Sequence, residues 1–206
     1  VRIISHLGRP NGTRSASLSM NHIVRVLQKY LGKPVVLVRN PLDANIMNRL
    51  KNSHEIILLE NIRFFHGEEK NQMHFARRLS QWGDWYVNEA FAACHRAHAS
   101  VALLPRLMPS YAGVRLEEEI EVLSGVMKRP KRPFVAILGG AKMETKLPLI
   151  RMLIKKADWM LMAGALANTL LFLKGCAIGK STADRHIIKD REHISLFRKK
   201  IIMLPS

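Results

Sequence analysis

The sequence predicts an α/β protein whose parallel sheets are divided between two lobes. Short apolar runs rich in Val, Ile and Leu alternate along the chain with longer segments of helical periodicity. Such alternation is typical of parallel sheets covered by helices on both faces, because parallel strands need crossover connections. The segment Lys128-Arg-Pro-Lys-Arg-Pro133 interrupts the pattern and marks a boundary between the lobes.

The first lobe is predicted from apolar runs that end at glycine or polar residues. The expected strands are Val1–Ser5, Val35–Val38, Ile56–Leu59 and Trp85–Asn88. The expected helices are Asn21–Leu31, Ala44–Lys51 and Asn71–Gln81. The first of these helices is amphipathic, so one side should pack on the sheet. That side is predicted to consist of Ile23, Val26, Leu27 and either Tyr30 or Leu31.

A charged helix, Leu116–Met127, is predicted to connect the lobes. Its first turn is acidic, which suits the positive end of a helix dipole. The predicted domains are 1–115, the connecting helix 116–128, and 129–206. In the last of these the expected strands are Phe134–Leu138, Trp159–Ala163 and Ile201–Leu204, and the expected helices are Lys146–Lys156, Leu166–Lys174 and Lys189–Lys199.

The start of the second lobe has the pattern of a phosphate site. The strand Phe134–Leu138 runs into Gly139-Gly140, where the backbone can turn tightly and approach a ligand. Thr145 is the expected N-cap of the next helix, with Lys146 at its first position and Pro148 in its first turn. Free N–H groups, a helix N-terminus and an ammonium group together favour a bound phosphate. The alternative is an ordinary turn with solvated lysines.

An arginine follows each of three predicted strands in the first lobe. Arg9 comes shortly after His6, Arg63 follows Ile56–Leu59, and Arg96 lies between two histidines. Because the carboxyl ends of parallel strands meet at one edge of a sheet, we expect these side chains to converge. With no carboxylate interleaved, they would suit a compact anion with several charges, such as a phosphorylated carboxylic acid. The alternative is three unrelated surface arginines.

These segments also carry a family resemblance. Its motifs are Ser5-His-Leu-Gly-Arg-Pro10, Leu59-Glu-Asn-Ile-Arg-Phe64, Tyr86-Val-Asn-Glu-Ala-Phe91 with His95-Arg-Ala-His-Ala-Ser100, Phe134 to Lys146, Ala163-Gly-Ala-Leu-Ala-Asn-Thr169 and Ile178-Gly-Lys-Ser181. In these motifs, and in their order and spacing, the sequence resembles the phosphoglycerate kinases over essentially its whole length. The resemblance implies two Rossmann-like lobes that close by hinge motion. It implies 3-phosphoglycerate or 1,3-bisphosphoglycerate in the first lobe and Mg-ADP or Mg-ATP in the second.

The resemblance also assigns roles to residues of this sequence. The implied substrate-binding residues are His6, Leu7, Gly8, Arg9, Arg63 and Arg96. The implied nucleotide-binding residues are Lys146, Gly139, Gly140 and Gly164. The implied catalytic residues are Lys142, Lys146 and Arg96. The implied reaction is reversible phosphoryl transfer in glycolysis, from the acyl phosphate of 1,3-bisphosphoglycerate to ADP, without a covalent enzyme intermediate. The metal would be carried by the nucleotide, with no metal site in the protein.

The sequence departs from the family pattern in three ways. The family's first strand, with a substrate-binding aspartate and asparagine, would lie before Val1, so the first lobe is expected to lack that strand. The chain stops before an acidic nucleotide contact and a second glycine-rich loop, so the second lobe is expected to be incomplete. Alanine or glutamate also replaces usual family residues near the sites. Ala163 and Ala165 stand where the family usually has glycines. Ala92, Ala93 and Glu89 stand where it usually has glycine, threonine and aspartate.

Net charge and the length of the apolar runs limit the other classes of function that are open to this chain. The formal net charge of +17 favours anionic partners, but the basic residues are scattered and form no stripe interleaved with aromatic residues. The hypothesis of a nucleic-acid-binding protein is therefore supported by net charge alone. The main alternative to an enzyme is a remnant that binds phosphoglycerate or another anion without catalysis. No apolar run reaches membrane-spanning length, and no secretion signal is present. A cytoplasmic location and a monomer, as is usual in the family, are expected.

Two other motifs are predicted to carry no chemistry. Gly175-Cys-Ala-Ile-Gly-Lys-Ser181 resembles a P-loop but has one residue too few between its glycines and follows a helix, so a turn is expected. Cys94, His95 and His98 lack a second pair of ligands, so a phosphate-side role for the histidines is preferred to a metal site. Cys94 and Cys176 are far apart in sequence and indicate no disulfide framework.

Overall fold

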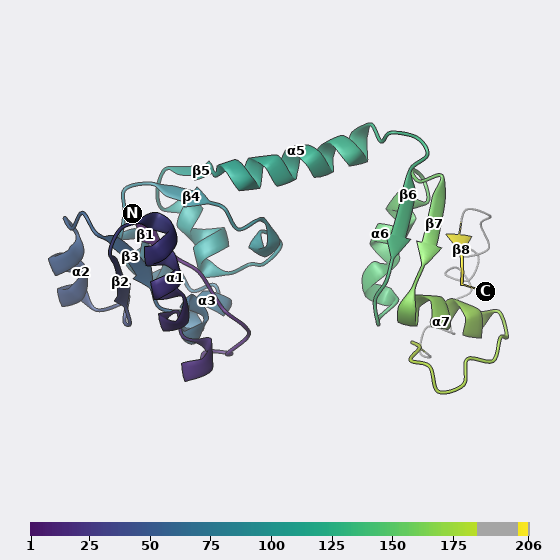
Figure 1. The fold of residues 1–206 in the computed structure, drawn as a ribbon, viewed down its shortest axis with the longest axis horizontal. Helices are drawn as coiled ribbons and strands as arrows, with labels where there is room; N and C mark the ends of the chain where they lie inside the picture. The colour runs from purple at the N-terminus through teal and green to yellow at the C-terminus, as the bar shows by residue number, and fades with distance from the viewer. Residues whose placement is uncertain (185–201, 206) are drawn as a thin grey trace. The chain divides into compact units, whose positions relative to one another are not determined.

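The computed structural model describes residues 1–184 and 202–205 and divides the chain into two compact units (Figure 1). Unit 1 is Val1–Ile120 and unit 2 is Glu121–Ser206. All strand pairs in the described residues are parallel, and helices lie between successive strands. The predicted α/β class with parallel sheets is therefore confirmed.

Unit 1 contains two parallel sheets. The first has the order β1-β3-β2 and the second pairs β4 with β5. Its strands are β1 Arg2–Ile3, β2 Val35–Val38, β3 Ile56–Leu59, β4 Tyr86–Asn88 and β5 Ser110–Ala112. Its α-helices are α1 Asn21–Leu31, α2 Ala44–Leu50, α3 His66–Glu69 and α4 Met73–Ser80. Shorter helical turns are η1 Ala16–Leu18, η2 Ile62–Phe64, η3 Phe91–Ala93, η4 Ala99–Leu103 and η5 Leu104–Arg106. The sequence did not predict β5, because its three residues are exposed and form no apolar run.

Helices cover both faces of the sheet β1-β3-β2. Leu58 of β3 is fully buried on the face where α1 packs. Its neighbours Ile57 and Leu59 are fully buried on the opposite face, against α2 and α4. Successive side chains of a strand point to opposite faces, so a continuous apolar run such as Ile56–Leu59 requires cover on both. The predicted two-sided cover is thus confirmed for this sheet.

The bounds of α1 were predicted correctly, but its buried face was predicted only in part. Ile23, Val24 and Leu27 pack against the sheet. Val26 is 51% exposed and Tyr30 is 82% exposed, so these two side chains point away from it. Both faces of the helix carry apolar residues, and spacing alone did not separate Val24 from Val26.

Helix α5, Val114–Lys128, is longer than predicted and contains the point at which the two units divide. Its first turn is capped from outside by Glu89: Oε2 accepts the N–H of Arg115 at 2.9 Å and that of Leu116 at 3.2 Å. A carboxylate at this end suits the helix dipole. Gly113 is required beside it, because an added Cβ would lie 2.1 Å from Glu89 Cδ. The domain limits at 115 and 128, and hinge motion about this helix, stay predictions.

Unit 2 contains one parallel sheet with the order β6-β7-β8. Its elements are β6 Val135–Leu138, η6 Glu144–Lys146, α6 Leu147–Leu153, β7 Trp159–Met162, α7 Gly164–Leu173 and β8 Ile202–Met203. Figure 1 shows α6 and α7 beside β6 and β7, and the core lies between these elements. The predicted helix Lys189–Lys199 lies outside the described residues.

Only one face of the unit 2 sheet is covered by the described residues. Ala136 and Met160 are buried on the face toward α6 and α7. On the opposite face Ile137 is 73% exposed, Trp159 46% and Val135 43%. Within the described residues, the prediction of helices on both faces is confirmed for one face of this sheet. For the other face it stays a prediction, because the predicted helix Lys189–Lys199 lies outside those residues.

Ile150 and Leu149 on α6 give a matched test of the unit 2 core. Ile150 is fully buried, whereas its neighbour Leu149 is 37% exposed. Ile150→Ala is expected to lower the free energy of unfolding by about 2–5 kcal/mol, because it removes buried methyl groups and leaves a cavity. Leu149→Ala should cost about 1 kcal/mol or less. Urea unfolding of the two variants checks this, and equal losses would contradict the assigned core.

Candidate active site

The segment that follows β3 is buried and polar, which is unusual in a protein interior. Glu60 is 4% exposed, Asn61 0% and Arg63 4%. Buried polar groups are costly unless they are hydrogen-bonded. Each of these three side chains bonds to backbone or side-chain groups of residues 7–20, the loop between β1 and α1.

Glu60 fixes the end of that loop at which α1 begins. Its Oε1 accepts the N–H of Met20 at 2.7 Å, and its Oε2 accepts the hydroxyl of Ser19 at 2.8 Å. Oε1 also accepts the N–H of Asn61 at 2.8 Å. The carboxylate therefore binds donors from both segments and holds them in register.

Arg63 fixes the middle of the same loop. Its Nη1 donates to the carbonyl of Gly8 at 2.8 Å, and its own carbonyl accepts the N–H of Gly12 at 3.1 Å. Gly8 has φ +64°, a conformation that favours glycine, and lies against Leu18. The Nε atom of Arg63 is buried without a hydrogen bond and lies 3.7 Å from Glu69 Oε1. This edge of the guanidinium thus faces Glu69 and is closed to solvent.

Arg96 lies in the segment between β4 and η4, and the far end of this segment is anchored to α3. Glu68, which is 2% exposed, accepts the N–H of Ser100 at 2.9 Å and its hydroxyl at 2.6 Å. The same carboxylate lies 3.8 Å from Nδ1 of His98. Since α3 directly follows η2, the segments that carry Arg63 and Arg96 are joined through Glu68.

The charges of these residues perturb one another. Burial lowers the pKa of Arg63, and the positive charges of Arg96 and, to a smaller extent, Arg9 lower it further. Burial also lowers the pKa of His6 and His98, with Arg63 as the largest charged cause for each. Both histidines are therefore neutral at pH 7 in the folded protein. Such coupling requires that the five side chains share one small region.

The predicted substrate-side residues are thus brought together in unit 1, with one difference from the sequence prediction. We call the cluster of His6, Arg9, Arg63, Arg96 and His98 the basic cluster. The prediction that no carboxylate is interleaved was wrong, because Glu68 and Glu69 of α3 lie against it. Sequence reasoning missed them since it considered only residues that directly follow strands. The acidic pair five and six residues after Arg63 was the available signal.

Burial also acts on the buried acid of α3. It raises the pKa of Glu68, and this effect outweighs the hydrogen bonds from Ser100 and the charge of Arg63, which lower the pKa. Beside it, burial raises the pKa of Tyr86 to about 12, with smaller contributions from Cys94 and Glu68. Tyr86 is therefore a neutral phenol at pH 7.

The predicted nucleotide-side residues lie in unit 2, at the carboxyl ends of β6 and β7. Ala163 N–H donates to the carbonyl of Leu138 at 2.8 Å, which makes Gly139 and Gly164 neighbours across the sheet edge. Gly140 has φ +148°, and a Cβ added to it would lie 3.3 Å from Lys146 Cε. The structure therefore brings the glycines and Lys146 together and leaves Lys142 exposed in the same turn.

Two local predictions in unit 2 have different outcomes. Thr145 is not the N-cap of α6: that position is Lys146, without a side-chain cap, and α6 begins at Leu147. The Thr145 hydroxyl instead donates to the carbonyl of Lys142 at 3.0 Å, because a short helical turn, η6, precedes α6. Pro148 does lie in the first turn. The segment that resembles a P-loop forms a turn at 179–180, as predicted.

The whole chain matches one family model. Residues 1–206 match the model described as phosphoglycerate kinase. The chain belongs to the phosphoglycerate kinase family. The resemblance that the motifs indicated is thereby confirmed.

Relatives of this family are similar over nearly all of the chain. The phosphoglycerate kinase of Rhodospirillum centenum is 41% identical over 187 residues, which are 90% of this chain and 47% of the relative. That of Methylorubrum extorquens is 39% identical over 211 residues, or 100% of this chain and 52% of the relative. The chain spans about half the length of the curated relatives that it matches.

Solved structures of the same family share the fold. Phosphoglycerate kinase from Coxiella burnetii has a TM-score of 0.77 at 34% identity, and covers 100% of this chain with 53% of its own. The enzyme from Pyrococcus horikoshii OT3 has a TM-score of 0.80 at 27% identity, over 99% of this chain and 54% of its own. Two Rossmann-like lobes with parallel sheets, as predicted, are therefore confirmed.

Within residues 1–184 and 202–205, no three His, Cys, Asp or Glu residues are grouped so that they could hold a metal ion. In that same part of the chain, no helix has both the length and the apolar character needed to span a bilayer.

The two histidines of the basic cluster predict a pH dependence of stability. Their folded-state pKa values lie below the ordinary value of 6.5. Between the folded value and 6.5 the unfolded chain binds more protons, so stability rises with pH and is fully present above about 6.5. Glu68 acts oppositely, because its raised pKa makes its contribution disappear as pH rises above its ordinary value of 4.5. The double replacement His6→Asn and His98→Asn isolates the histidine contribution.

The free energy of unfolding, measured in urea between about pH 5 and 8, checks this. The double variant should lose much of the increase with pH seen in the unsubstituted chain below 6.5. His54→Asn, at an exposed position, is the control and should leave the profile unchanged. Parallel profiles for the double variant and the unsubstituted chain would show that the histidines are not held neutral in the fold.

Proposed function

We propose that this chain contains the substrate half-site and much of the nucleotide half-site of a phosphoglycerate kinase. The proposed reaction is reversible phosphoryl transfer from 1,3-bisphosphoglycerate to ADP, giving 3-phosphoglycerate and ATP. The carboxylate of 3-phosphoglycerate is the leaving group in this direction and the phosphoryl acceptor in the reverse direction. The observation that carries the proposal is the basic cluster of unit 1, in a chain that matches the family model from end to end.

The basic cluster supports phosphoglycerate as the ligand of unit 1. Arg63 is buried, and Arg9 and Arg96 are near enough to perturb its pKa. Guanidinium groups donate paired hydrogen bonds to carboxylate and phosphate oxygens. A small ligand with both groups would neutralise the mutual repulsion of the arginines. Leu7 and Gly8 belong to the same proposed site through the loop backbone.

The turn after β6 supports a nucleotide phosphate in unit 2. Gly139 and Gly140 are exposed and without side chains, and Lys146 lies beside Gly140. Exposed backbone next to an ammonium group fits phosphate oxygens. The family implies Mg-ADP or Mg-ATP, and the metal would help to neutralise the phosphates while bound to them. Lys142 and Gly164 complete the proposed nucleotide side.

The chemistry proposed for these residues is positioning and neutralisation of charge. In-line phosphoryl transfer needs no nucleophilic side chain, because the carboxylate of one substrate and the phosphate of the other react directly. Arg96, Lys142 and Lys146 would stabilise negative charge on the transferred group. Closure of the lobes to exclude water, a cytoplasmic location and a monomeric state are further parts of the proposal.

A binding protein without catalysis is the second candidate. The specific feature in its favour is that Ala163 and Ala165 stand where the family resemblance implies glycines, on either side of Gly164 after β7. A coupled assay for ATP formation from 1,3-bisphosphoglycerate and ADP separates the two. Activity above a chain with Lys146→Ala supports the enzyme, while phosphoglycerate binding without activity supports the binding protein.

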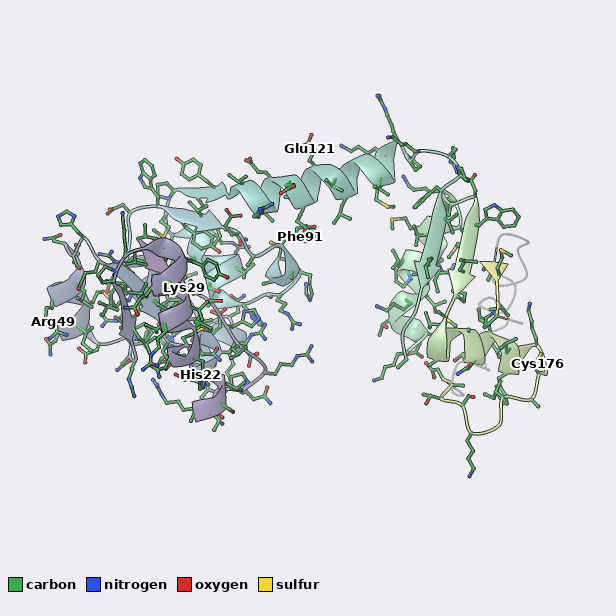
Figure 2. The ribbon with its side chains drawn as sticks, viewed as in Figure 1. His22, Lys29, Arg49, Phe91, Glu121 and Cys176 are labelled. Carbon is green, nitrogen blue, oxygen red and sulfur yellow. The ribbon has the colours of Figure 1, made fainter. Side chains whose placement is uncertain are left out.

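Arg96→Ala tests the substrate side. We expect its dissociation constant for 3-phosphoglycerate to rise about tenfold or more, because a hydrogen bond to a charged group contributes about 1.5–3 kcal/mol. Calorimetry at low and high salt measures this, and binding by the unsubstituted chain should weaken with salt. Arg49→Ala is the control. Figure 2 shows Arg49, on α2, and Phe91 at opposite ends of unit 1, and Phe91 begins the stretch of chain that runs to Arg96. No binding by the unsubstituted chain at low salt would refute the proposal.

Lys146→Ala tests the nucleotide side independently. We expect weaker ADP binding by about tenfold, since the variant removes the ammonium group beside Gly140. Lys155→Ala, an exposed lysine just after α6, should bind ADP as the unsubstituted chain does. Calorimetry with ADP in the presence of Mg²⁺ checks both. Equal effects of the two variants would show that Lys146 does not bind the nucleotide.

A further inference from the structure

The side-chain amide of Asn61 joins the three pieces of chain that shape the substrate side. Its Nδ2 donates to the carbonyl of Leu7 at 2.8 Å and to the carbonyl of Leu18 at 2.9 Å. Its Oδ1 accepts the N–H of Arg63 at 3.1 Å. Asn61 thus uses both donors and one acceptor, and no part of it is exposed.

The two acceptors lie near opposite ends of the loop between β1 and α1. Leu7 is beside His6 and two residues before Arg9, while Leu18 ends η1, shortly before α1. Between these points η1 is the one helix or strand of the loop in the described structure. One amide therefore closes the loop and fixes where its basic residues lie. It does so from the residue that also caps η2, the turn that carries Arg63.

Other hydrogen bonds also join these two segments, but each of them holds only one part of the loop. Ile62 N–H donates to Ser5, and Arg63 bonds to Gly8 and Gly12. These bonds hold the first half of the loop. Glu60 holds Ser19 and Met20 at its far end. Among the hydrogen bonds of the described residues, those of the Asn61 side chain alone reach both halves of the loop.

We propose that Asn61 is the positioning residue of the phosphoglycerate site, setting the placement of His6 and Arg9 against Arg63. The proposal rests on the function proposed above. Asn61 is fully buried, and we do not propose that it touches the ligand. It acts through the loop, and its loss would weaken phosphoglycerate binding by letting the basic residues separate.

Asn61→Asp is the sharpest substitution, because it keeps the shape and the acceptor for Arg63 but replaces both donors by an oxygen. That oxygen faces two carbonyl oxygens and cannot bond to them. At about pH 8 we expect the dissociation constant for 3-phosphoglycerate, by calorimetry, to rise about tenfold or more. Asn45→Asp makes the same chemical change at an exposed position of α2 and should bind as the unsubstituted chain does.

The pH profile separates positioning from a general loss of stability. Protonation of the new carboxyl restores one donor, so the ratio of the two dissociation constants, Asn61→Asp over Asn45→Asp, should fall toward pH 5. The other charged groups on the joined segments are Glu60, Arg63, His6, Arg9 and Arg14, and they are common to both variants. The titration of the ligand therefore cancels in the ratio, and the change that remains reports the carboxyl group at position 61 together with its effect on these neighbours. A folded Asn61→Asp chain with normal binding at pH 8, or a ratio that does not change with pH, would overturn the proposal.

A measurement on the unsubstituted chain covers the case in which Asn61→Asp does not fold. Both Asn61 side-chain N–H protons should exchange slowly with solvent, and their NMR signals should shift with 3-phosphoglycerate at the same midpoint as the Gly8 amide. Rapid exchange, or no shift while Gly8 shifts, would overturn the positioning role.

Failure of the proposed function gives a different pattern. In that case the unsubstituted chain does not bind 3-phosphoglycerate at all. The positioning role is then tested by exchange alone: protection of the Gly12 amide, which donates to Arg63, should fall in Asn61→Asp and not in Asn45→Asp. Equal protection in both variants would overturn it.

Discussion

Three polar residues among the four positions after a buried strand hold the candidate substrate site in place. A strand that ends in the core would normally expose its next residues to solvent, yet Glu60, Asn61 and Arg63 remain buried. They can do so because the loop between β1 and α1 satisfies each of them. The dependence runs both ways, since the loop has little regular structure of its own. Removal of a partner would leave buried groups unpaired, which costs more than the bond itself contributes.

Like charges in the basic cluster repel one another, and the fold limits the cost in two ways. Glu69 lies near the Arg63 guanidinium, and Glu68 lies near His98 while bonded to Ser100. Burial and the arginines also lower the pKa of His6 and His98, so that these groups add no charge at pH 7. The cluster that results has excess positive charge. A small anion with more than one charge would complete it.

The sequence predicted much of the fold because the strong signals were local. The bounds of α1, β2 and β3 were predicted exactly as observed, since each has a continuous pattern that ends at a clear breaker. The strand β5 is too short and too exposed to leave such a pattern. The N-cap of α6 was misplaced because a short helical turn before it competes for the Thr145 hydroxyl. Cover of the second face of the unit 2 sheet stays a prediction, because the described residues leave Ile137 exposed.

The candidate site was predicted in outline for the same reason. Arginines at strand ends are visible in sequence, and parallel topology brings such ends together. The carboxylates of α3 and the amide of Asn61 were not assigned roles, because their importance depends on contacts between residues 32 to 54 positions apart. Spacing along the chain carries no record of such contacts, and a single sequence therefore identifies the ligand-facing groups before the groups that hold them.

A crystal structure of this chain with 3-phosphoglycerate tests the central claim most directly. We expect one ligand in unit 1 that lies within hydrogen-bonding distance of Arg9, Arg63 and Arg96. The loop between β1 and α1 should still be hydrogen-bonded to Asn61. A ligand bound elsewhere, or arginine side chains directed to separate faces with the ligand held by only one of them, would contradict it.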